Sequence, residues 1–435
     1  MAARMRNGHK EESGILELVL CRSYRCLTAV RAVIVALLRR MALGARRCGP
    51  IMVRLLVATV WTVWLLGYAS TQPAPLAPQT GKLPYWDQQR KGANCFNRDC
   101  DRAYFAAARA AGIRVVRLTW SKWKGAGRDF LLGNADDFKG IPPADPQRLR
   151  EVLDWAAAED VKIVVVPLSL PGMRWQQQND GRFDARLWTD FKYHRQAAAF
   201  WKELASALRG HPAVVAYNLV NEPAPARAMK VDLADRAARE AFEKRVAGTA
   251  ADVNTLYASL ILAVRAVDPD TPILLDGGDF AAPAHIDFLR PVADQRTLYA
   301  VHCYEPWNYT TFQINGGKIP YPGPEVVQRE LAQVDAWARR NGVPAHRIIL
   351  SEFGCDRRVP GVEQYLSDVI KSANGFGWHW AFYAFREDEW DGLDYELGPG
   401  KRPYSYWQAI ERGEHPAPPR KDNPIWRVLA REFQP

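Results

Sequence analysis

Two glutamates stand at positions where a charge is unusual, just after long apolar runs. Glu222 follows the run Ala213–Val220, and Glu352 follows the run Arg347–Ser351. Two carboxyl groups about 5–5.5 Å apart can cleave a glycosidic bond with retention of configuration, one as a protonated acid and the other as an ionised nucleophile. Repulsion between two negative charges separates their pKa values and makes this division possible. We therefore expect Glu222 and Glu352 to act as a catalytic pair.

Further polar residues lie within or just after other apolar runs. His302 and Tyr304 are two positions apart, so on a strand both side chains face the same way. A tyrosine hydroxyl beside Glu352 would donate a hydrogen bond and keep that carboxylate ionised, whereas His302 would bind a sugar hydroxyl or orient a carboxylate. Arg117 lies inside the apolar run Arg114–Leu118. A buried arginine needs an anionic partner, and Glu352 is the candidate.

Eight short apolar runs alternate with longer amphipathic stretches from about Lys82 onward. Several are almost continuously apolar, which is typical of parallel strands buried on both faces. No glycine-rich phosphate loop follows the first run, so we expect an α/β fold of the closed (β/α)₈ TIM-barrel type rather than an open doubly wound sheet. In such a barrel the chemistry lies at the C-terminal ends of the strands. The runs are Gly92–Phe96, Arg114–Leu118, Lys162–Leu168, Ala213–Val220, Pro272–Asp276, Leu298–His302, Arg347–Ser351 and Trp378–Phe385.

The stretches between these runs carry apolar residues at helical spacing, and several end at Gly or Pro breaks. Two longer segments are insertions: Ala224–Ala250 is charged and helical, and Arg386–Asp422 is rich in Gly, Pro and aromatic residues. We expect Pro424–Phe433 to form a final helix that packs on the barrel. The other expected helices are Asp101–Ala111, Pro146–Glu159, Ala185–Arg209, Ala251–Val267, Pro324–Arg340 and Gly361–Ser372.

Three motifs in this order resemble glycoside hydrolase family 5, the cellulase-like family of clan A. They are Asn221-Glu222-Pro223, His302-x-Tyr304 and Ser351-Glu352-Phe353-Gly354, and the resemblance extends from about Lys91 to Phe385. The resemblance implies a (β/α)₈ barrel and retaining hydrolysis without a cofactor. By the same resemblance Glu222 is the acid/base, Glu352 is the nucleophile, and Asn221 contacts the 2-hydroxyl of the sugar at the cleavage point. The supporting residues that it implies are Arg117, His302 and Tyr304.

The chain departs from the family pattern at two strand ends. Many members carry a histidine after the third strand, whereas here Val166–Gly172 has none. The family usually places a tryptophan under the sugar at the end of the eighth strand. In Trp378–Glu387, Trp380 is a candidate core residue, and Trp390 from the following loop is the candidate for that position. These differences leave the chemistry intact and the substrate open.

The 16 tryptophans of the chain suit a sugar-binding protein, because flat apolar rings pack on the C–H faces of pyranoses. Trp120, Trp175, Trp307 and Trp390 follow strand ends, as does Trp123, so each is a candidate to line a sugar subsite. Packing against a loop is the alternative for each of them.

An acidic cluster after the eighth run superficially resembles a metal-binding loop. It consists of Glu387, Asp388, Glu389, Asp391 and Asp394. Its spacing does not follow the calcium-loop pattern. We therefore expect a polar rim that offers acceptors to sugar hydroxyls, and no metal or other cofactor.

The formal net charge of +10 does not indicate a nucleic-acid partner. Residues 1–70 contain 11 Lys or Arg against 3 Asp or Glu, so the remaining chain is nearly neutral. These basic residues precede the apolar run Leu55–Ala69, and small residues and the Pro-rich stretch Thr71–Pro78 follow, in the order of a signal peptide. The run is short for a membrane span of about 20 residues. We expect export to the periplasm or beyond, with an uncleaved membrane tether through 55–69 as the alternative.

The expected organisation is a basic extension with a signal or anchor in 1–70, a linker in 71–81 and one catalytic domain in 82–435. Four cysteines follow the export signal: Cys95, Cys100, Cys303 and Cys355. In an exported protein they either pair as Cys95–Cys100 and Cys303–Cys355 or remain buried thiols.

These features together predict a retaining hydrolase of a β-linked polysaccharide or oligosaccharide, similar to cellulases and β-glucanases. A β-mannanase and a transglycosylase are the alternatives on the same barrel. A catalytically silent glycan-binding barrel is the alternative of another class, and the intact glutamate pair argues against it. The expected partner is the glycan substrate, and no protein partner is predicted.

Overall fold

The computed structural model describes residues 81–435 except 99, 234, 312–315 and 435. Eight parallel strands form a closed barrel in sequence order, and β8 returns to pair with β1. This confirms the expected (β/α)₈ barrel, and each apolar run coincides with one strand apart from a few residues at its ends. The strands are β1 (Lys91–Cys95), β2 (Val115–Leu118), β3 (Lys162–Val165), β4 (Val214–Asn218), β5 (Ile273–Asp276), β6 (Thr297–Cys303), β7 (Ile348–Phe353) and β8 (His379–Phe382).

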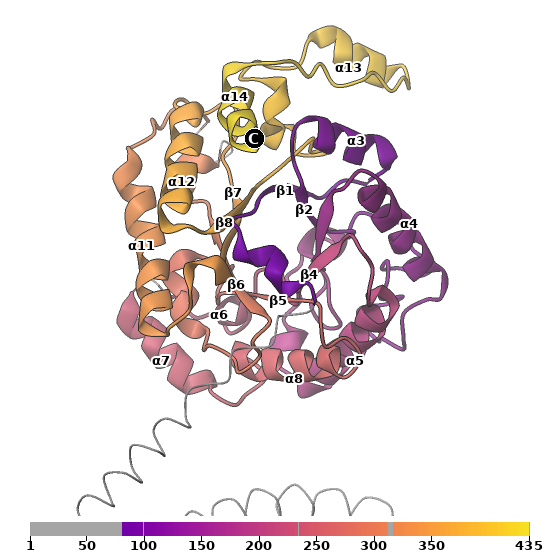
Figure 1. The fold of residues 1–435 in the computed structure, drawn as a ribbon, viewed down its shortest axis with the longest axis vertical. Coiled ribbons are helices and arrows are strands. Elements are labelled where there is room, and N and C mark those ends of the chain that lie inside the picture. Colours follow the sequence, from indigo (N-terminus) through magenta and orange to yellow (C-terminus); the bar gives the residue numbers. More distant parts are fainter. Residues whose placement is uncertain (1–80, 99, 234, 312–315, 435) are drawn as a thin grey trace, which may run out of the picture. The chain divides into compact units, whose positions relative to one another are not determined.

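Helices surround the barrel, and α13 lies outside this ring (Figure 1). The α-helices are α3 (Arg102–Ala110), α4 (Ala144–Ala158), α5 (Phe191–Leu208), α6 (Pro225–Ala228), α7 (Arg236–Val246), α8 (Val253–Arg265), α9 (Trp307–Thr310), α11 (Pro324–Arg340), α12 (Val362–Phe376), α13 (Tyr404–Glu411) and α14 (Pro424–Ala430). The 3₁₀ turns are η1 (Leu83–Asp87), η2 (Gln176–Gln178), η3 (Arg186–Trp188), η4 (Pro283–Phe288), η5 (Ala345–Arg347), η6 (Asp391–Leu393), η7 (Tyr395–Leu397) and η8 (Arg431–Phe433).

The largest difference between a predicted and an observed helix boundary is at the start of α5, and the sequence explains it. A helix is predicted from Ala185, but α5 begins at Phe191 after the short turn η3. Asp190 has an extended backbone, and its side chain accepts a hydrogen bond from the backbone N–H of Lys192. An aspartate in this position satisfies an otherwise free N–H and so starts a helix.

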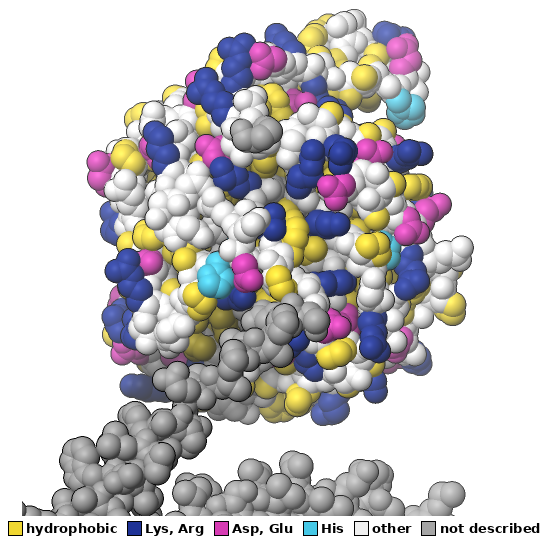
Figure 2. Space-filling view, viewed as in Figure 1, with side chains coloured by type: hydrophobic (Ala, Val, Ile, Leu, Met, Phe, Trp, Pro, Cys, Tyr) yellow, Lys and Arg dark blue, Asp and Glu magenta, His cyan; other side chains and the backbone are white. Residues whose placement is uncertain are grey.

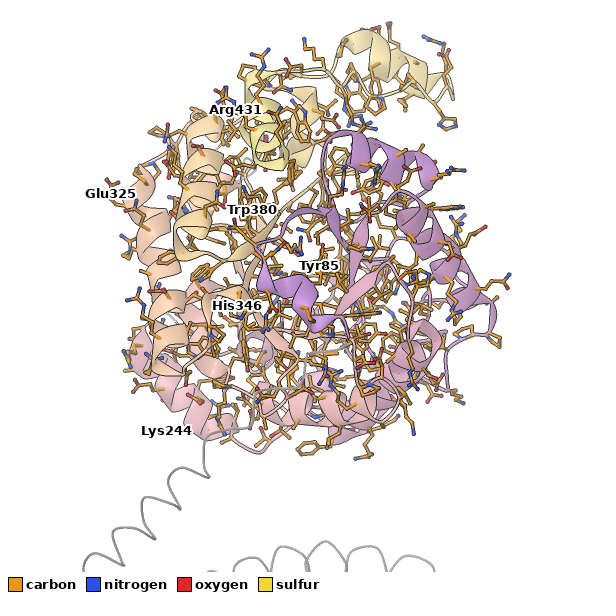
Figure 3. All side chains as sticks on the ribbon, in the orientation of Figure 1. Tyr85, Lys244, Glu325, His346, Trp380 and Arg431 are labelled. Carbon is orange, nitrogen blue, oxygen red and sulfur yellow. The ribbon has the colours of Figure 1, made fainter. Side chains whose placement is uncertain are left out.

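The strands are buried on both faces, as their apolar composition requires. Every residue of β4 and β6 is buried. The outward side chains pack against the helices, whose far sides carry charged residues such as Lys244 on α7 and Glu325 on α11 (Figure 3). Trp380 of β8 lies in the interior and is 1% exposed.

The turn η1 lies across the N-terminal end of the barrel (Figure 1). Trp86 is buried there against the first residues of several strands, and its indole N–H donates to Val215 O at 3.0 Å. Figure 2 views this end, where Lys and Arg side chains are interspersed with acidic and apolar ones. Because this end is filled by side chains, a substrate can enter the barrel axis from the opposite end.

The C-terminal segments pack on the barrel as expected. Ile425 and Leu429 of α14 are buried, and Phe433 contacts Trp380 with ring centroids 5.6 Å apart. The insertion Arg386–Asp422 forms short turns and α13. Fully buried Arg357 anchors the insertion, because its guanidinium donates to backbone carbonyls of Asp391, Gly398 and Gly400.

The four cysteines of the barrel are buried and unpaired, which matches the second of the two predicted alternatives. The sulfur atoms of Cys95 and Cys100 lie 3.6 Å apart. The predicted export segment and nearly all of the linker lie outside the described residues. No helix in residues 81–435, as far as they are described, has the length and apolar character needed to cross a membrane.

Candidate active site

A cleft of about 980 Å³ opens among the loops that follow the strands, at the end of the barrel opposite η1. This is the end at which (β/α)₈ barrels carry their chemistry. The predicted site residues that line it are Arg117, Asn221, Glu222, His302, Tyr304, Glu352, Trp175, Trp307 and Trp390.

The two glutamates reach the cleft in different ways. Glu352 belongs to β7, whereas Glu222 follows β4 in the left-handed region, with φ 48°. This conformation is uncommon for a residue with a side chain, and it persists where surrounding contacts hold it. The backbone N–H of Glu222 donates to Asp276 Oδ2 at 3.0 Å. The end of β5 therefore holds the turn that presents Glu222.

The carboxyl groups of the pair lie close together. One carboxylate oxygen of Glu222, one of Glu352 and a ring nitrogen of His302 are all within 4.8 Å of one another. Retaining glycoside hydrolases separate their carboxyl groups by about 5–5.5 Å, whereas inverting enzymes need about 6.5–9.5 Å to admit a water. The observed separation fits direct attack by one carboxylate on the sugar.

Glu352 is surrounded by groups that favour its charged form. The guanidinium of Arg117 donates to Oε1, and the hydroxyl of Tyr304 donates to Oε2 at 2.8 Å. Burial alone would raise the pKa of Glu352, but the charges of His302 and Arg117 and these hydrogen bonds hold it below its usual value. The surroundings of Glu352 therefore favour its ionised form.

Glu222 has the opposite shift. Removal from water raises its pKa, and the negative charges of Glu352 and Asp276 add to this, although a hydrogen bond with His302 partly opposes it. His302 Nδ1 lies 2.7 Å from Glu222 Oε1. Glu222 therefore retains a proton at a pH where Glu352 has lost its own.

His302 lies between the two glutamates, with Nδ1 3.7 Å from Glu352 Oε2. Burial lowers the pKa of His302, but the negative charges of Glu352, Glu222 and Asp276 raise it above its usual value overall. Of the sequence alternatives, orienting a carboxylate is the one that this contact fits.

Arg117 connects several strands at the floor of the cleft. Besides Glu352, its guanidinium donates to Oδ1 of Asn218 at 3.0 Å, of Asn94 at 3.1 Å and of Asn221 at 2.5 Å. Only 4% of its side chain is exposed, so these partners satisfy a buried charge. The predicted pairing of Arg117 with Glu352 is present.

Sequence reasoning missed Asp276, which is fully buried at the end of β5. Its carboxylate accepts from Glu222 N and from Asn218 Nδ2 and lies 3.7 Å from His302 Nε2. The signal was available, because Asp276 ends an apolar run in the same way as the two glutamates. Asn94 was also missed; its side-chain amide donates to Ser351 O at 2.9 Å and thereby supports β7.

Three aromatic side chains form a wall on one side of the cleft, which we call the aromatic wall: Phe96, Trp175 and Trp390. The ring centroids of Phe96 and Trp175 are 4.7 Å apart, and those of Trp175 and Trp390 are 6.2 Å apart. Trp307 also lines the cleft and is 53% exposed. The predicted subsite positions of Trp175, Trp307 and Trp390 are thus all at the cleft.

The prediction for Trp120 is wrong. Trp120 is 3% exposed and packs in the main hydrophobic core, because its neighbour Thr119 faces the cleft and successive side chains point in opposite directions. Trp380 is also a core residue. At the end of β8 it is Tyr383 that lines the cleft, with its ring centroid 6.3 Å from that of Trp390.

The acidic cluster is not a simple polar rim. Glu387 and Asp394 are both fully buried. Lys122 reaches Glu387 Oε1 at 2.8 Å and Asp388 Oδ1 at 2.9 Å, and its ammonium also lies 4.3 Å from the ring centroid of Phe96. Lys122 thus neutralises part of the cluster and fixes the loop that carries Trp390.

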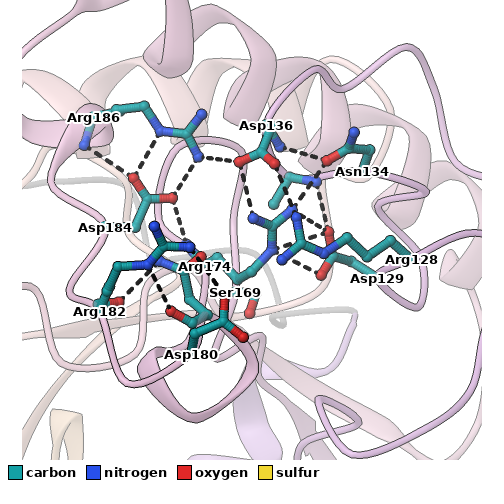
Figure 4. Close-up of polar contacts among 12 residues, drawn as sticks. Arg128, Asp129, Asn134, Asp136, Ser169, Arg174, Asp180, Arg182, Asp184 and Arg186 are labelled. Carbon is teal, nitrogen blue, oxygen red and sulfur yellow. Dashed lines mark hydrogen bonds and ion pairs between the residues drawn. The ribbon is translucent and has the colours of Figure 1, made fainter.

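An ion-pair network centred on buried Arg174 supports the loop that carries Trp175 (Figure 4). Arg174 is 3% exposed and donates to Asp129 and Asp136 from the preceding loop. Its backbone N–H donates to Asp184, which also pairs with Arg186. Arg174 therefore ties the loop after β3 to the loop after β2, next to the aromatic wall.

Within the described residues, a metal site built from three His, Cys, Asp or Glu side chains would have to include the two glutamates. In the described part of the chain, the one group of three His, Cys, Asp or Glu side chains close enough to share an ion is Glu222, His302 and Glu352. Arg117 already neutralises Glu352, and a guanidinium repels a cation. The donor set therefore suits glycoside cleavage better than a metal site.

Comparisons with known proteins found a curated relative and several solved structures that are similar to this chain. A curated relative, a beta-xylosidase from Phanerodontia chrysosporium, is 24% identical over 245 residues, which are 54% of this chain and 42% of the relative. This chain thus spans less than half the length of that relative.

Among solved structures, Thermotoga maritima Cel5A in complex with cellobiose has a TM-score of 0.56, and its complex with mannotriose has one of 0.55. Both are 15% identical to this chain, and each match covers 80% of this chain and 99% of that structure. The model of the family described as Cellulase (glycosyl hydrolase family 5) matches residues 80–389, which is more than two thirds of the chain. The chain therefore belongs to glycosyl hydrolase family 5.

Proposed function

We propose that this enzyme hydrolyses a β-linked glucan by double displacement, with Glu352 as nucleophile and Glu222 as acid/base. The separation of the two carboxyl groups, within 4.8 Å, carries this proposal. The opposite pKa shifts of the two glutamates support the same assignment of roles.

In the first step a carboxylate oxygen of Glu352 bonds to the anomeric carbon while the glycosidic bond breaks. Glu222 transfers its proton to the departing oxygen, so the leaving sugar is released as a neutral alcohol. Arg117 and Tyr304 hold Glu352 ionised until attack. Asn221, which accepts from Arg117, lies in the cleft where the 2-hydroxyl of the reacting sugar would be bound.

In the second step Glu222 acts as a base. Once Glu352 is esterified its negative charge is gone, and that charge had raised the pKa of Glu222. Glu222 then takes a proton from water, the water oxygen bonds to the anomeric carbon, and the ester bond to Glu352 breaks. The sugar leaves with its original configuration.

A glucan is favoured as substrate because the structural neighbours include an endoglucanase and a complex with cellobiose. A β-mannan is the second candidate, since a neighbour also binds mannotriose. The aromatic wall supports either choice, because the C–H faces of both sugars can pack on it.

Hydrolysis of matched β-1,4-glucan and β-1,4-mannan oligosaccharides, followed by NMR, tests the proposal. We expect cleavage of the glucan series, with the β-anomer of the product appearing first. Initial release of the α-anomer would show inversion and contradict the assigned roles. Glu240→Gln, on the exposed face of α7, is the matched control.

We also propose that the chain is exported through the apolar run Leu55–Ala69. The basic, apolar and small residues in this order support the proposal. N-terminal sequencing of protein recovered outside the cytoplasm is expected to begin near the Pro-rich stretch Thr71–Pro78. An intact N-terminus on membrane-associated protein would instead indicate an anchor.

A further inference from the structure

Side-chain contacts close one side of the cleft, over the ends of β1 and β2. The aromatic wall combines Phe96 from the loop after β1, Trp175 from the loop after β3 and Trp390 from the loop after β8. In the closed barrel β1 and β2 lie between β8 and β3. Loops of neighbouring strands lie close together in any barrel, whereas Trp175 and Trp390 join loops of strands that are not neighbours. The rings therefore extend over the two strand ends between them.

Lys122, from the loop after β2, reinforces this closure. Its ammonium lies 4.3 Å from the ring centroid of Phe96 and 5.4 Å from that of Trp390. It also pairs with Glu387 and Asp388 of the loop after β8. Only 4% of the lysine side chain is exposed, and a charge so far removed from water depends on its ionic partners. The loops after β1, β2, β3 and β8 are therefore joined as one boundary of the cleft.

The boundary continues from the loop after β3 to the loop after β4. Arg227 of α6 donates to Gln176 Oε1 at 2.9 Å, and its guanidinium lies 4.6 Å from the ring centroid of Phe183. Arg227 and Gln176 both line the cleft. Trp307, after β6, also lines the cleft, but it is 53% exposed. The rings on the β1 side thus contact one another, whereas the ring after β6 faces solvent.

This asymmetry limits how a glycan can lie in the cleft. An enzyme that cuts inside a long chain needs room for sugars on both sides of the reacting centre. A glycan that continued over β1 and β2 would have to pass through three rings in mutual contact, and packed side chains leave little room for extra atoms. One side of the reacting centre therefore accommodates the end of a chain.

The position of Glu222 indicates which end of the chain this is. Glu222 follows β4 and is held by Asp276 at the end of β5, and β5 lies opposite β1 in the ring of eight strands. The departing oxygen lies beside the carboxyl group that protonates it, so the departing part of the glycan extends toward β4 and β5. The part that contains the attacked anomeric carbon carries the non-reducing end, and it faces the aromatic wall.

Resting on the proposed function, we propose that the enzyme acts on chain ends and shortens the β-glycan from its non-reducing end. The aromatic wall and Lys122 close the cleft on the side where an internally cutting enzyme would admit further sugars. The departing chain leaves on the side of Trp307.

Hydrolysis of two forms of one oligosaccharide tests the proposal. One is cellopentaose, and the other is cellopentaose with a 4,6-O-ethylidene group on its non-reducing sugar. An enzyme that cuts internally still reaches bonds remote from the blocked sugar. We expect the native chain to cleave the blocked form at least about 100-fold more slowly, because the added atoms have no room against the closed side. Chromatography of the early products measures both rates.

Two variants test whether the aromatic wall is the closing element. Trp175→Ala and Trp390→Ala each remove one ring of the wall and should reduce the preference for the unblocked form about tenfold. Trp407→Ala, on α13 and outside the cleft, removes a ring that is 44% exposed and should leave the preference unchanged. The comparison of the two forms with the native chain needs no variant, so it stands even if a variant fails to fold.

The outcomes separate this proposal from the proposed function. Similar native rates on the two forms would show internal cutting, so the chain-end assignment would be wrong while the proposed function stands. A native preference that persists undiminished in both folded tryptophan variants would show that the aromatic wall does not close the cleft. If the native chain cleaves neither unblocked cellopentaose nor mannopentaose, the proposed function is wrong, and the chain-end assignment is wrong with it.

Discussion

Glu352 and Glu222 have the same side chain and share one cleft, but their surroundings differ. Two donors, Arg117 and Tyr304, are directed at the Glu352 carboxylate. Glu222 contacts His302 and faces the negative charges of Glu352 and Asp276. The comparison indicates that the number of hydrogen-bond donors and the signs of nearby charges, rather than burial alone, decide which carboxyl group is ionised.

The largest effect is expected on the Glu352 side of the comparison. Glu352→Gln keeps the size of the side chain but removes the attacking carboxylate. We expect kcat on cellotetraose to fall by at least about 10⁴-fold, because no covalent intermediate can form. Initial-rate measurement checks this, with Glu240→Gln on α7 as the control. Retention of most of the rate would show that the roles are assigned wrongly.

A smaller and more selective effect is expected on the Glu222 side. Glu222→Ala should reduce the rate on cellotetraose by about 10²–10⁴-fold, the range for loss of a general acid. β-Cellobiosyl fluoride needs no protonation to leave, so its glycosyl–enzyme should still form and accumulate. Mass spectrometry of the trapped enzyme detects the added cellobiosyl group. An unmodified Glu352 under these conditions would contradict the assignment.

We expect the dependence of kcat/KM on pH to have an acid limb and an alkaline limb, one for each glutamate. In the proposed mechanism Glu352 must be ionised and Glu222 protonated, so we expect the acid limb of kcat/KM to follow Glu352 and the alkaline limb to follow Glu222. Tyr304→Phe removes a hydrogen bond that lowers the pKa of Glu352. The acid limb should therefore move to higher pH. A shift of the alkaline limb alone would show that Tyr304 affects the pKa of Glu222 rather than that of Glu352.

Asp276→Asn provides the matched change for the other limb. The negative charge of Asp276 raises the pKa of Glu222. The alkaline limb should therefore move to lower pH. The asparagine retains one acceptor oxygen for the backbone N–H of Glu222. The same rate-against-pH series measures this shift, and an upward shift would contradict it.

The smallest effect, no change at all, is expected on metal removal. The carboxylates that lie close enough to share an ion are already paired with Arg117, Tyr304 and His302. Dialysis against EDTA should therefore leave kcat on cellotetraose unchanged. A loss that added Mg²⁺, Ca²⁺ or Zn²⁺ restores would show that the glutamate pair binds a metal.

The amino-acid sequence was sufficient for the barrel and for the pair. Each strand is encoded by its own apolar run, and a charge at the end of such a run indicates the strand's C-terminal end. The three motifs therefore placed Glu222, His302, Tyr304 and Glu352 correctly at one end of the barrel.

The tertiary structure decided what depends on contacts between distant segments. Whether Trp120 or Tyr383 faces the cleft depends on the direction of each side chain at its strand end. The role of Asp276 arises only where β4, β5 and β6 converge. Residues 279–281 have φ values of 43°, 61° and 57° without a glycine among them, so no residue type in the sequence signals this conformation. Hydrogen bonds join the segment to Pro223 and His302. Local patterns encode strands and their ends, whereas closure of the barrel brings together the charges and backbone contacts that distinguish one carboxyl from the other.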